Sequence, residues 1–127
     1  RLLDRHASRV AREYARRRAL LLAALTRRMP DGVTWTTPQG GFSLLMTLPA
    51  DLSAAALLSR ALERGVAFTP GAAFFVDGGG GNTLRLSFSS VPASRIEEGA
   101  RRLSDVIKES LRRPARPRLE RATVPLV

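Results

Sequence analysis

The 127-residue sequence contains no cysteine, one histidine and one lysine. Without cysteine, the chain forms no disulfide and offers no thiolate for catalysis or metal binding. The single histidine, His6, excludes a metal site built only from histidines. His6 and Lys108 also leave almost no side chain that can act as a general base. We therefore expect this segment to bind or orient a substrate, with no catalytic residue and no metal site of its own.

Long hydrophobic runs are also absent. The longest apolar stretch covers residues 19–25, far short of the roughly 20 residues that span a membrane. The first five residues lack the basic, apolar and small-residue order of a secretory signal. We expect a cytoplasmic location and no membrane partner. Because the chain begins with arginine inside a predicted helix, we interpret it as part of a longer protein or as a trimmed chain.

The net charge of +10 is concentrated at the two ends of the chain. Residues 1–30 hold nine arginines against two acids, which gives +7, and residues 101–127 hold eight basic residues against three acids, which gives +5. Residues 31–100 hold four arginines against six acids, which gives −2. A basic surface can bind nucleic acid through phosphate contacts, but arginines also suit the solvated face of an amphipathic helix. We favour the solvated face and keep a basic nucleic-acid-binding module as an alternative.

Apolar periodicity and turn residues predict three helices and four strands. The first helix has an apolar stripe that includes Val10 and Leu25, and Ser53 is a suitable N-cap for the second, with Gly65 as its stop. Gly99 weakens the third helix, so we expect a close packing contact to require it. The predicted elements are, in order, a helix at 2–29, strands at 33–37 and 42–48, a helix at 54–64, strands at 66–69 and 83–89, and a helix at 92–112.

This order predicts an α+β fold, in which a small antiparallel sheet of about four strands has helices packed on one face. The long amino-terminal helix is part of that layer. Residues 114–127 alternate proline and arginine without an apolar period, which predicts a disordered tail.

Arg85 lies in the middle of the predicted strand at residues 83–89, between apolar residues that alternate with small hydroxyl residues. Alternation places Leu84 and Leu86 on one face, and Arg85 and Ser87 on the other. A guanidinium held on a rigid strand suits a carboxylate, which it binds through two parallel hydrogen bonds. The strand alone favours a simpler alternative, a solvent-facing arginine on a one-sided sheet.

Six motifs occur in a characteristic order: Tyr14-x-x-Arg17-Arg18; Pro38-x-Gly40-Gly41-Phe42; Leu48-Pro49; Gly65-Val66-Ala67-Phe68-x-Pro70-Gly71; Leu84-Arg85-Leu86-Ser87-Phe88; and Ile96-x-Glu98-Gly99-x-x-Arg102-Leu103. Together they resemble the carboxy-terminal small domain of class I/II, fold-type I aminotransferases that use pyridoxal 5′-phosphate. The most similar branch contains 2-aminoadipate and broad-range amino-acid aminotransferases. The resemblance covers about residues 5–112.

The resemblance implies that Arg85 pairs with the α-carboxylate of an amino-acid or 2-oxo-acid substrate. It also implies that Gly40 and Gly41 lie along the active-site cleft and that Pro70 and Gly71 lie near the carboxylate pocket. For these four residues, ordinary turn chemistry is an equally good explanation.

The resemblance further implies a domain organisation. Residues 1–113 would form the small domain, with 1–29 as the long inter-domain helix, and residues 114–127 would form the tail. The family's cofactor-binding residues belong to a large domain that this sequence does not contain. The complete enzyme would be a homodimer that moves an amino group between an α-amino acid and a 2-oxo acid, and this segment alone would be inactive.

A second alternative comes from the same resemblance. Some transcription regulators carry an aminotransferase-like domain that senses an effector and is fused to a DNA-binding domain. An upstream DNA-binding domain would distinguish this class from the enzyme.

Overall fold

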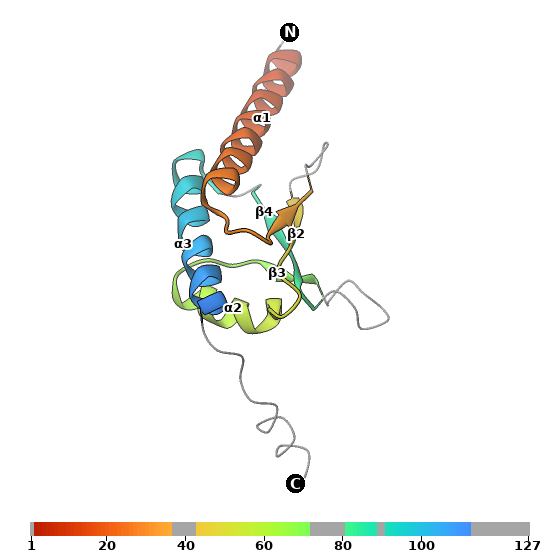
Figure 1. The fold of residues 1–127 in the computed structure, drawn as a ribbon. Helices are drawn as coiled ribbons and strands as arrows, with labels where there is room; N and C mark the ends of the chain where they lie inside the picture. Colours follow the sequence, from red (N-terminus) through yellow and green to blue (C-terminus); the bar gives the residue numbers. More distant parts are fainter. Residues whose placement is uncertain (1, 37–42, 72–80, 89–90, 113–127) are drawn as a thin grey trace, which may run out of the picture.

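Strands β2 (Ser43–Thr47) and β4 (Thr83–Ser87) form the centre of a four-stranded antiparallel sheet with the order β1-β2-β4-β3. The edge strands are β1 (Thr34–Trp35) and β3 (Thr69–Pro70). This is a computed structural model, which describes residues 2–36, 43–71, 81–88 and 91–112. Its helices are α1 (Leu2–Arg28), α2 (Ala54–Glu63) and α3 (Ala93–Arg112) (Figure 1).

The two central strands have one buried face and one open face. Leu44 of β2 pairs with Leu86 of β4, and Met46 pairs with Leu84; all four side chains are buried. Arg85, between the two leucines of β4, is exposed. Because successive residues of a strand point to opposite faces, the helices cover the leucine face and leave the arginine face open.

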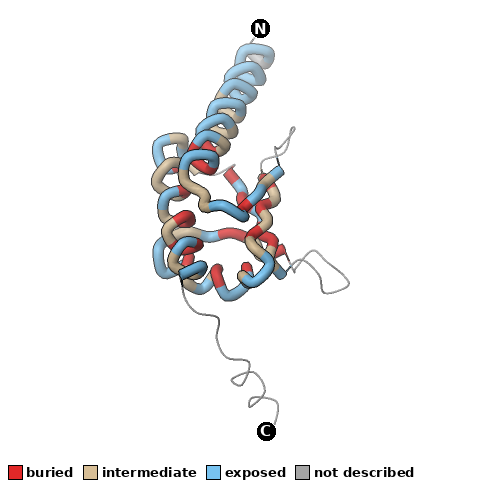
Figure 2. The backbone as a smooth tube through the Cα atoms, viewed as in Figure 1, coloured by how far each residue is buried: buried red, intermediate tan, exposed pale blue. Residues whose placement is uncertain are grey.

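The core lies between the covered face of the sheet and the three helices. In Figure 2 the parts of the backbone tube that are coloured as buried gather there. Full burial of apolar side chains of this size contributes about 1.5–3 kcal/mol each, which makes this layer the main source of stability. The helices contribute to the core through Leu21, Ala24, Leu25, Ala54, Leu57, Ala61, Ile96, Ala100, Leu103, Val106 and Ile107.

Polar contacts fix the end of α1 against α3. Arg27 and Arg28 both donate hydrogen bonds to the Glu97 carboxylate. The buried Ser104 hydroxyl donates to the Arg28 carbonyl, with an O···O distance of 2.5 Å. The last turn of a helix leaves carbonyls without a partner inside the helix, so this hydroxyl satisfies one of them.

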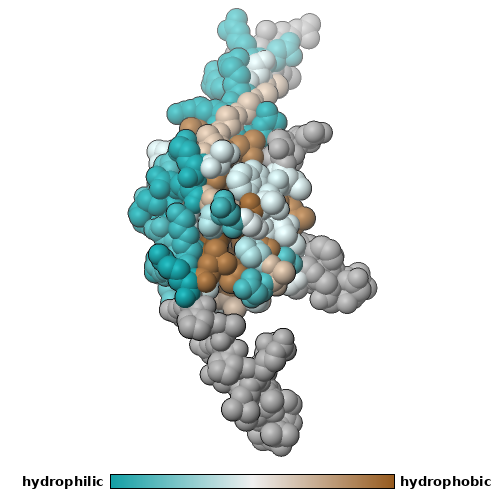
Figure 3. Space-filling view, in the orientation of Figure 1, coloured by the Kyte–Doolittle hydropathy of each residue, from teal (hydrophilic) through white to brown (hydrophobic). Residues whose placement is uncertain are grey.

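The first half of α1 extends away from the sheet (Figure 1). Residues 4–12 are exposed, and Val10 keeps 49% of its surface accessible. Figure 3 shows a weakly apolar stripe along this half, between hydrophilic side chains. The predicted apolar stripe is therefore packed only in the second half of α1, because the described chain provides nothing for the first half to pack on.

The predicted α+β fold with helices on one face of an antiparallel sheet is confirmed. The strand predicted at residues 66–69 is shorter and shifted, since only Thr69 and Pro70 pair with β4. The physical reason lies at Val66, whose amide donates to the Ala61 carbonyl at an N···O distance of 2.9 Å. Val66 thus closes the end of α2 and does not join the sheet.

The predicted limits of α2 are also confirmed. The Ser53 hydroxyl accepts a hydrogen bond from the Ala56 amide, with an O···N distance of 3.2 Å. Gly65 follows the helix with φ of +80°, a backbone conformation that glycine adopts without strain.

Some predictions fall on residues outside the described ranges. These are Gly40, Gly41 and the tail at residues 114–127. None of the described helices combines the length and the apolar character that crossing a membrane requires.

Candidate functional site

Arg85 lies at the centre of the open face of the sheet. Its strand, β4, is hydrogen-bonded on both sides, to β2 and to β3. A backbone held on two sides keeps the direction of the arginine stem fixed, so the predicted rigid support for this guanidinium is present. The side chain is exposed on the face that no described helix covers.

Two residues lie directly opposite Arg85 on the neighbouring strands. The register pairs Leu45 of β2 and Thr69 of β3 with Arg85. Directly paired residues share a face, with Cβ atoms about 5 Å apart. Leu45 and Thr69 are both half-buried, and they flank Arg85 on its two sides. Neither residue could be predicted from the sequence, because their positions depend on a strand register that local patterns do not reveal.

The other side chains on the open face are short, and most of them carry a hydroxyl group. Arg85 is the one charged residue in the described strands, which contain no aspartate, glutamate or lysine. By register and alternation, its companions on this face are Thr34, Ser43, Leu45, Thr47, Thr69, Thr83 and Ser87. A single guanidinium among short neutral side chains can bind a small anion without competition from a carboxylate of these strands.

Gly71 lies beside the same face for a packing reason. A Cβ atom at this position would be 1.7 Å from Thr83 Oγ1 and 2.9 Å from the Thr83 carbonyl oxygen. Any side chain here would therefore push β4 away. Thr83 and Arg85 share the open face, so Gly71 lets the chain after β3 approach that face closely.

Pro70 belongs to β3 and pairs with Leu84, which places it on the covered side of the sheet. Proline is tolerated there because β3 is an edge strand and needs hydrogen bonds on one side only. Of the residues predicted for the site, Arg85 and Gly71 are thus brought to the open face. Gly40 and Gly41 lie outside the described residues.

The described residues provide neither a lysine amine on the Arg85 face nor a metal site. Lys108 is exposed on α3, in the helical layer, and the sheet separates this layer from the Arg85 face. Among the described residues, no group of three or more His, Cys, Asp or Glu side chains could hold a metal ion. The described strands thus present one cation and several hydroxyl groups on the open face.

A family model described as "Aminotransferase class I and II" matches residues 3–103. Among curated proteins, aromatic-amino-acid aminotransferase 1 of Thermococcus litoralis is 42% identical over 111 residues, which cover 87% of this chain and 27% of that protein. At lower identity, 28%, the chain is similar to an uncharacterized HTH-type transcriptional regulator of Bacillus subtilis.

Two solved structures have the same fold as the chain. A multiple substrate aminotransferase from Thermococcus profundus superposes with a TM-score of 0.82 at 43% identity, covering 89% of this chain and 28% of that one. LysN, an alpha-aminoadipate aminotransferase from Thermus thermophilus solved with N-(5′-phosphopyridoxyl)-L-leucine, gives a TM-score of 0.81 at 45% identity, covering 86% and 28%. The chain thus spans about a quarter of the length of the proteins it matches.

Proposed function

Because the chain belongs to the family of class I and II aminotransferases, we propose that residues 1–113 are the small domain of a pyridoxal 5′-phosphate-dependent aminotransferase. The complete enzyme moves an amino group from an α-amino acid to a 2-oxo acid. The part played by this domain is to bind the substrate, and Arg85 holds the α-carboxylate.

The observation that carries this proposal is the position of Arg85 on the open face. A carboxylate that approaches this face meets two parallel N–H donors on a strand fixed from both sides. Leu45 and Thr69 limit the sideways motion of the arginine stem. The substrate carboxylate is thereby held in one orientation, which is how a binding residue contributes to rate.

The cofactor itself does not fit the residues of this chain. The only lysine, Lys108, is separated from the Arg85 face by the sheet. The described strands contain no acidic residue for a pyridine nitrogen and no second cation for a phosphate. We assign cofactor binding to the large domain, which belongs to the part of the enzyme outside this chain.

The proposed domain organisation gives a role to the exposed half of α1. Residues 1–29 are the inter-domain helix, and the exposed apolar side of Val10 packs on the large domain. Gly40, Gly41 and Gly71 are proposed to border the carboxylate site, and Pro70, on the covered side of the sheet, is proposed to support it from behind. The complete enzyme is proposed to be a homodimer.

An effector-sensing role in a transcription regulator is less favoured, because the more similar curated relatives are aminotransferases.

The test of this function uses the complete enzyme with Arg85→Leu and Arg85→Lys. Losing one partner of a hydrogen-bonded charge pair in a closed site costs about 2–5 kcal/mol, so kcat/KM for an amino-acid substrate should fall at least roughly 30-fold in Arg85→Leu. Arg85→Lys should be less affected, since it keeps the charge without the bidentate geometry.

The absorbance of the bound cofactor serves as the readout for folding in both variants. The matched control is Arg112→Leu, at the exposed end of α3, which should keep the activity of the parent. Equal turnover by Arg85→Leu and the parent enzyme would refute the assigned role.

A further inference from the structure

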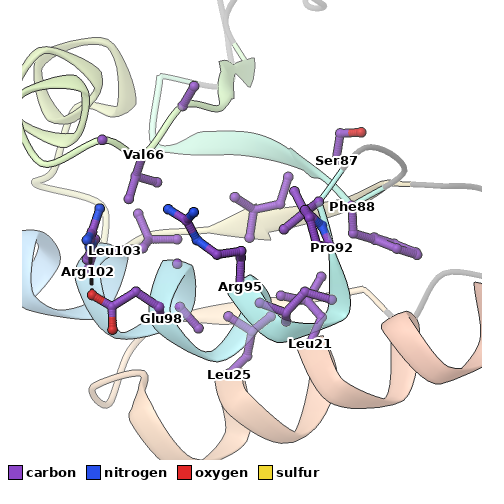
Figure 4. Close-up of a pocket in the computed structure, with 17 residues that line it drawn as sticks. Leu21, Leu25, Val66, Ser87, Phe88, Pro92, Arg95, Glu98, Arg102 and Leu103 are labelled. Atoms are coloured by element: carbon purple, nitrogen blue, oxygen red, sulfur yellow. Dashed lines mark hydrogen bonds and ion pairs between the residues drawn. The ribbon is translucent and has the colours of Figure 1, made fainter.

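Side chains along residues 83–88 alternate between the two sides of the sheet. Figure 4 shows Phe88 on the covered side and Ser87 pointing away from it. The Phe88 ring stacks on Tyr14 of α1, with 5.5 Å between the ring centroids. On this covered side, the close packing contact predicted for Gly99 is absent from the described chain, since a Cβ atom there would meet nothing within 4 Å. Arg85 lies two residues before Ser87 and shares its side, so a ligand of Arg85 meets the residues of the open face.

By register, Thr69 is the hydroxyl residue nearest to Arg85 in the described strands. The two residues are directly paired, which places their Cβ atoms about 5 Å apart. Thr83 and Ser87 lie two residues from Arg85 along β4, at roughly 7 Å. Leu45, which is paired with Arg85 on the other side, has no polar atom in its side chain. Arg85 therefore has a hydroxyl group on one flank and an apolar side chain on the other.

The chain around Thr69 limits the positions that its hydroxyl group can take. Pro70 follows it, and a residue before proline is restricted to extended backbone conformations. Gly71 then lies so close to Thr83 that a Cβ atom would be 1.7 Å from Thr83 Oγ1. Thr69 is also β-branched, which leaves its side chain few rotamers. Its half-buried hydroxyl makes no hydrogen bond with the residues that the structure describes, so it is available to a ligand.

A carboxylate that is bound by Arg85 can still accept further hydrogen bonds. Its two oxygens have about four lone-pair sites, and two parallel N–H bonds from a guanidinium use two of them. A carboxylate oxygen that lacks partners in a closed site is costly, and a hydrogen bond to a charged acceptor is stronger than one between neutral groups. Of the two residues paired with Arg85, Thr69 is the one whose side chain can donate.

We propose that the Thr69 hydroxyl is a second binding group for the α-carboxylate of the substrate, to which it donates a hydrogen bond directly or through one water molecule. Arg85 supplies the charge and two parallel hydrogen bonds. The bond from Thr69 prevents the carboxylate from tilting on the guanidinium, so that the reacting carbon of the substrate keeps one position. The proposal rests on the function proposed for Arg85 and adds a residue to that site.

The test measures how strongly the complete enzyme prefers an α-amino acid to the primary amine that has the same side chain but no carboxylate. This preference is the ratio of the two kcat/KM values. Thr69→Val removes the hydroxyl and keeps the shape of the side chain, and it should lower the ratio at least roughly tenfold. Thr69→Ser keeps a hydroxyl and should stay within about threefold of the parent. The absorbance of the bound cofactor reports folding in each variant.

Two further variants separate binding of the carboxylate from a structural role. Thr34→Val makes the same change on the same face, but on β1, the edge strand farthest from β3, and should leave the ratio unchanged. In an enzyme that already carries Arg85→Leu, Thr69→Val should lower the ratio by less than about twofold, because the carboxylate is no longer held beside Thr69. A hydroxyl that served only the fold would not depend on Arg85 in this way.

An unchanged ratio in Thr69→Val would overturn the proposal, whether or not the overall activity falls. An equal decrease in Thr34→Val would overturn it as well. The two assignments fail separately: if Arg85→Leu loses the preference for the amino acid and Thr69→Val keeps it, the role of Arg85 stands and that of Thr69 does not. If Arg85→Leu keeps the preference, the function proposed for Arg85 fails first.

Discussion

Arg85 has only neutral residues beside it in the described strands. Leu45 and Thr69 lie opposite it on the two adjacent strands, and the described strands carry no acid. No carboxylate of the described strands therefore competes with an incoming anion for Arg85. The strand position and the face of Arg85 follow from simple alternation in the sequence. Its flanking residues do not, because pairing between strands is decided by tertiary structure.

A new acid beside Arg85 should compete with the substrate. Leu45→Asp places a carboxylate on the directly paired position, about 5 Å away between Cβ atoms. We expect kcat/KM for amino acids to fall at least roughly tenfold, with most of the effect in KM, because the substrate must displace an internal ion pair. Ser43→Asp, paired with Ser87 on the same face, is the matched control and should have a smaller effect. Similar losses in the two variants would contradict this interpretation.

Gly71 should be intolerant of a side chain. Gly71→Ala forces a methyl group into Thr83, and overpacking of this kind costs about 1–3 kcal/mol of stability. The urea midpoint of the chain should fall accordingly. Gly81→Ala is the matched control, since a Cβ atom there meets nothing within 4 Å. If both variants unfold at the same urea concentration, the close approach to Thr83 is not a constraint.

At the scale of elements, periodicity was sufficient to predict the type and order of the helices and strands. The N-cap at Ser53 and the stop at Gly65 followed from local chemistry, and both are present. Prediction from the sequence failed where the structure of a segment depends on its tertiary contacts. Val66 bonds back to Ala61 and leaves the sheet. Val10 is exposed because no described residue covers that half of α1.

Ion pairs on α3 predict how stability depends on pH. Hydrogen bonds from Arg101 and then Arg102 lower the pKa of the Glu98 carboxyl from 4.5 to about 2. A carboxyl with a depressed pKa in the folded state contributes stability that is complete above its unfolded pKa. That contribution is lost as pH falls from about 4.5 towards about 2. Glu98→Gln should therefore flatten the dependence of the unfolding free energy on pH in this window.

Urea unfolding at several pH values between about 2 and about 5 measures this slope. The difference between parent and variant should shrink at 1 M salt, because these side chains are exposed and salt screens exposed charges. Identical slopes at low salt would show that the ion pairs do not contribute.

At the scale of the whole molecule, the described residues leave two surfaces uncovered, the open face with Arg85 and the first half of α1. The chain spans about a quarter of the length of its relatives, and we propose that the rest of the enzyme covers both surfaces. The sequence pattern could predict one folded layer, but it could not predict what covers that layer, since burial depends on tertiary contacts.

The central claim is that the guanidinium at position 85 recognises the α-carboxylate. The most direct measurement compares two amino donors in the complete enzyme: an α-amino acid and the primary amine with the same side chain but no carboxylate. The ratio of their kcat/KM values isolates the contribution of the carboxylate. We expect the parent to prefer the amino acid strongly, and we expect this preference to be at least roughly 30-fold smaller in Arg85→Leu. An unchanged ratio in Arg85→Leu would contradict the claim.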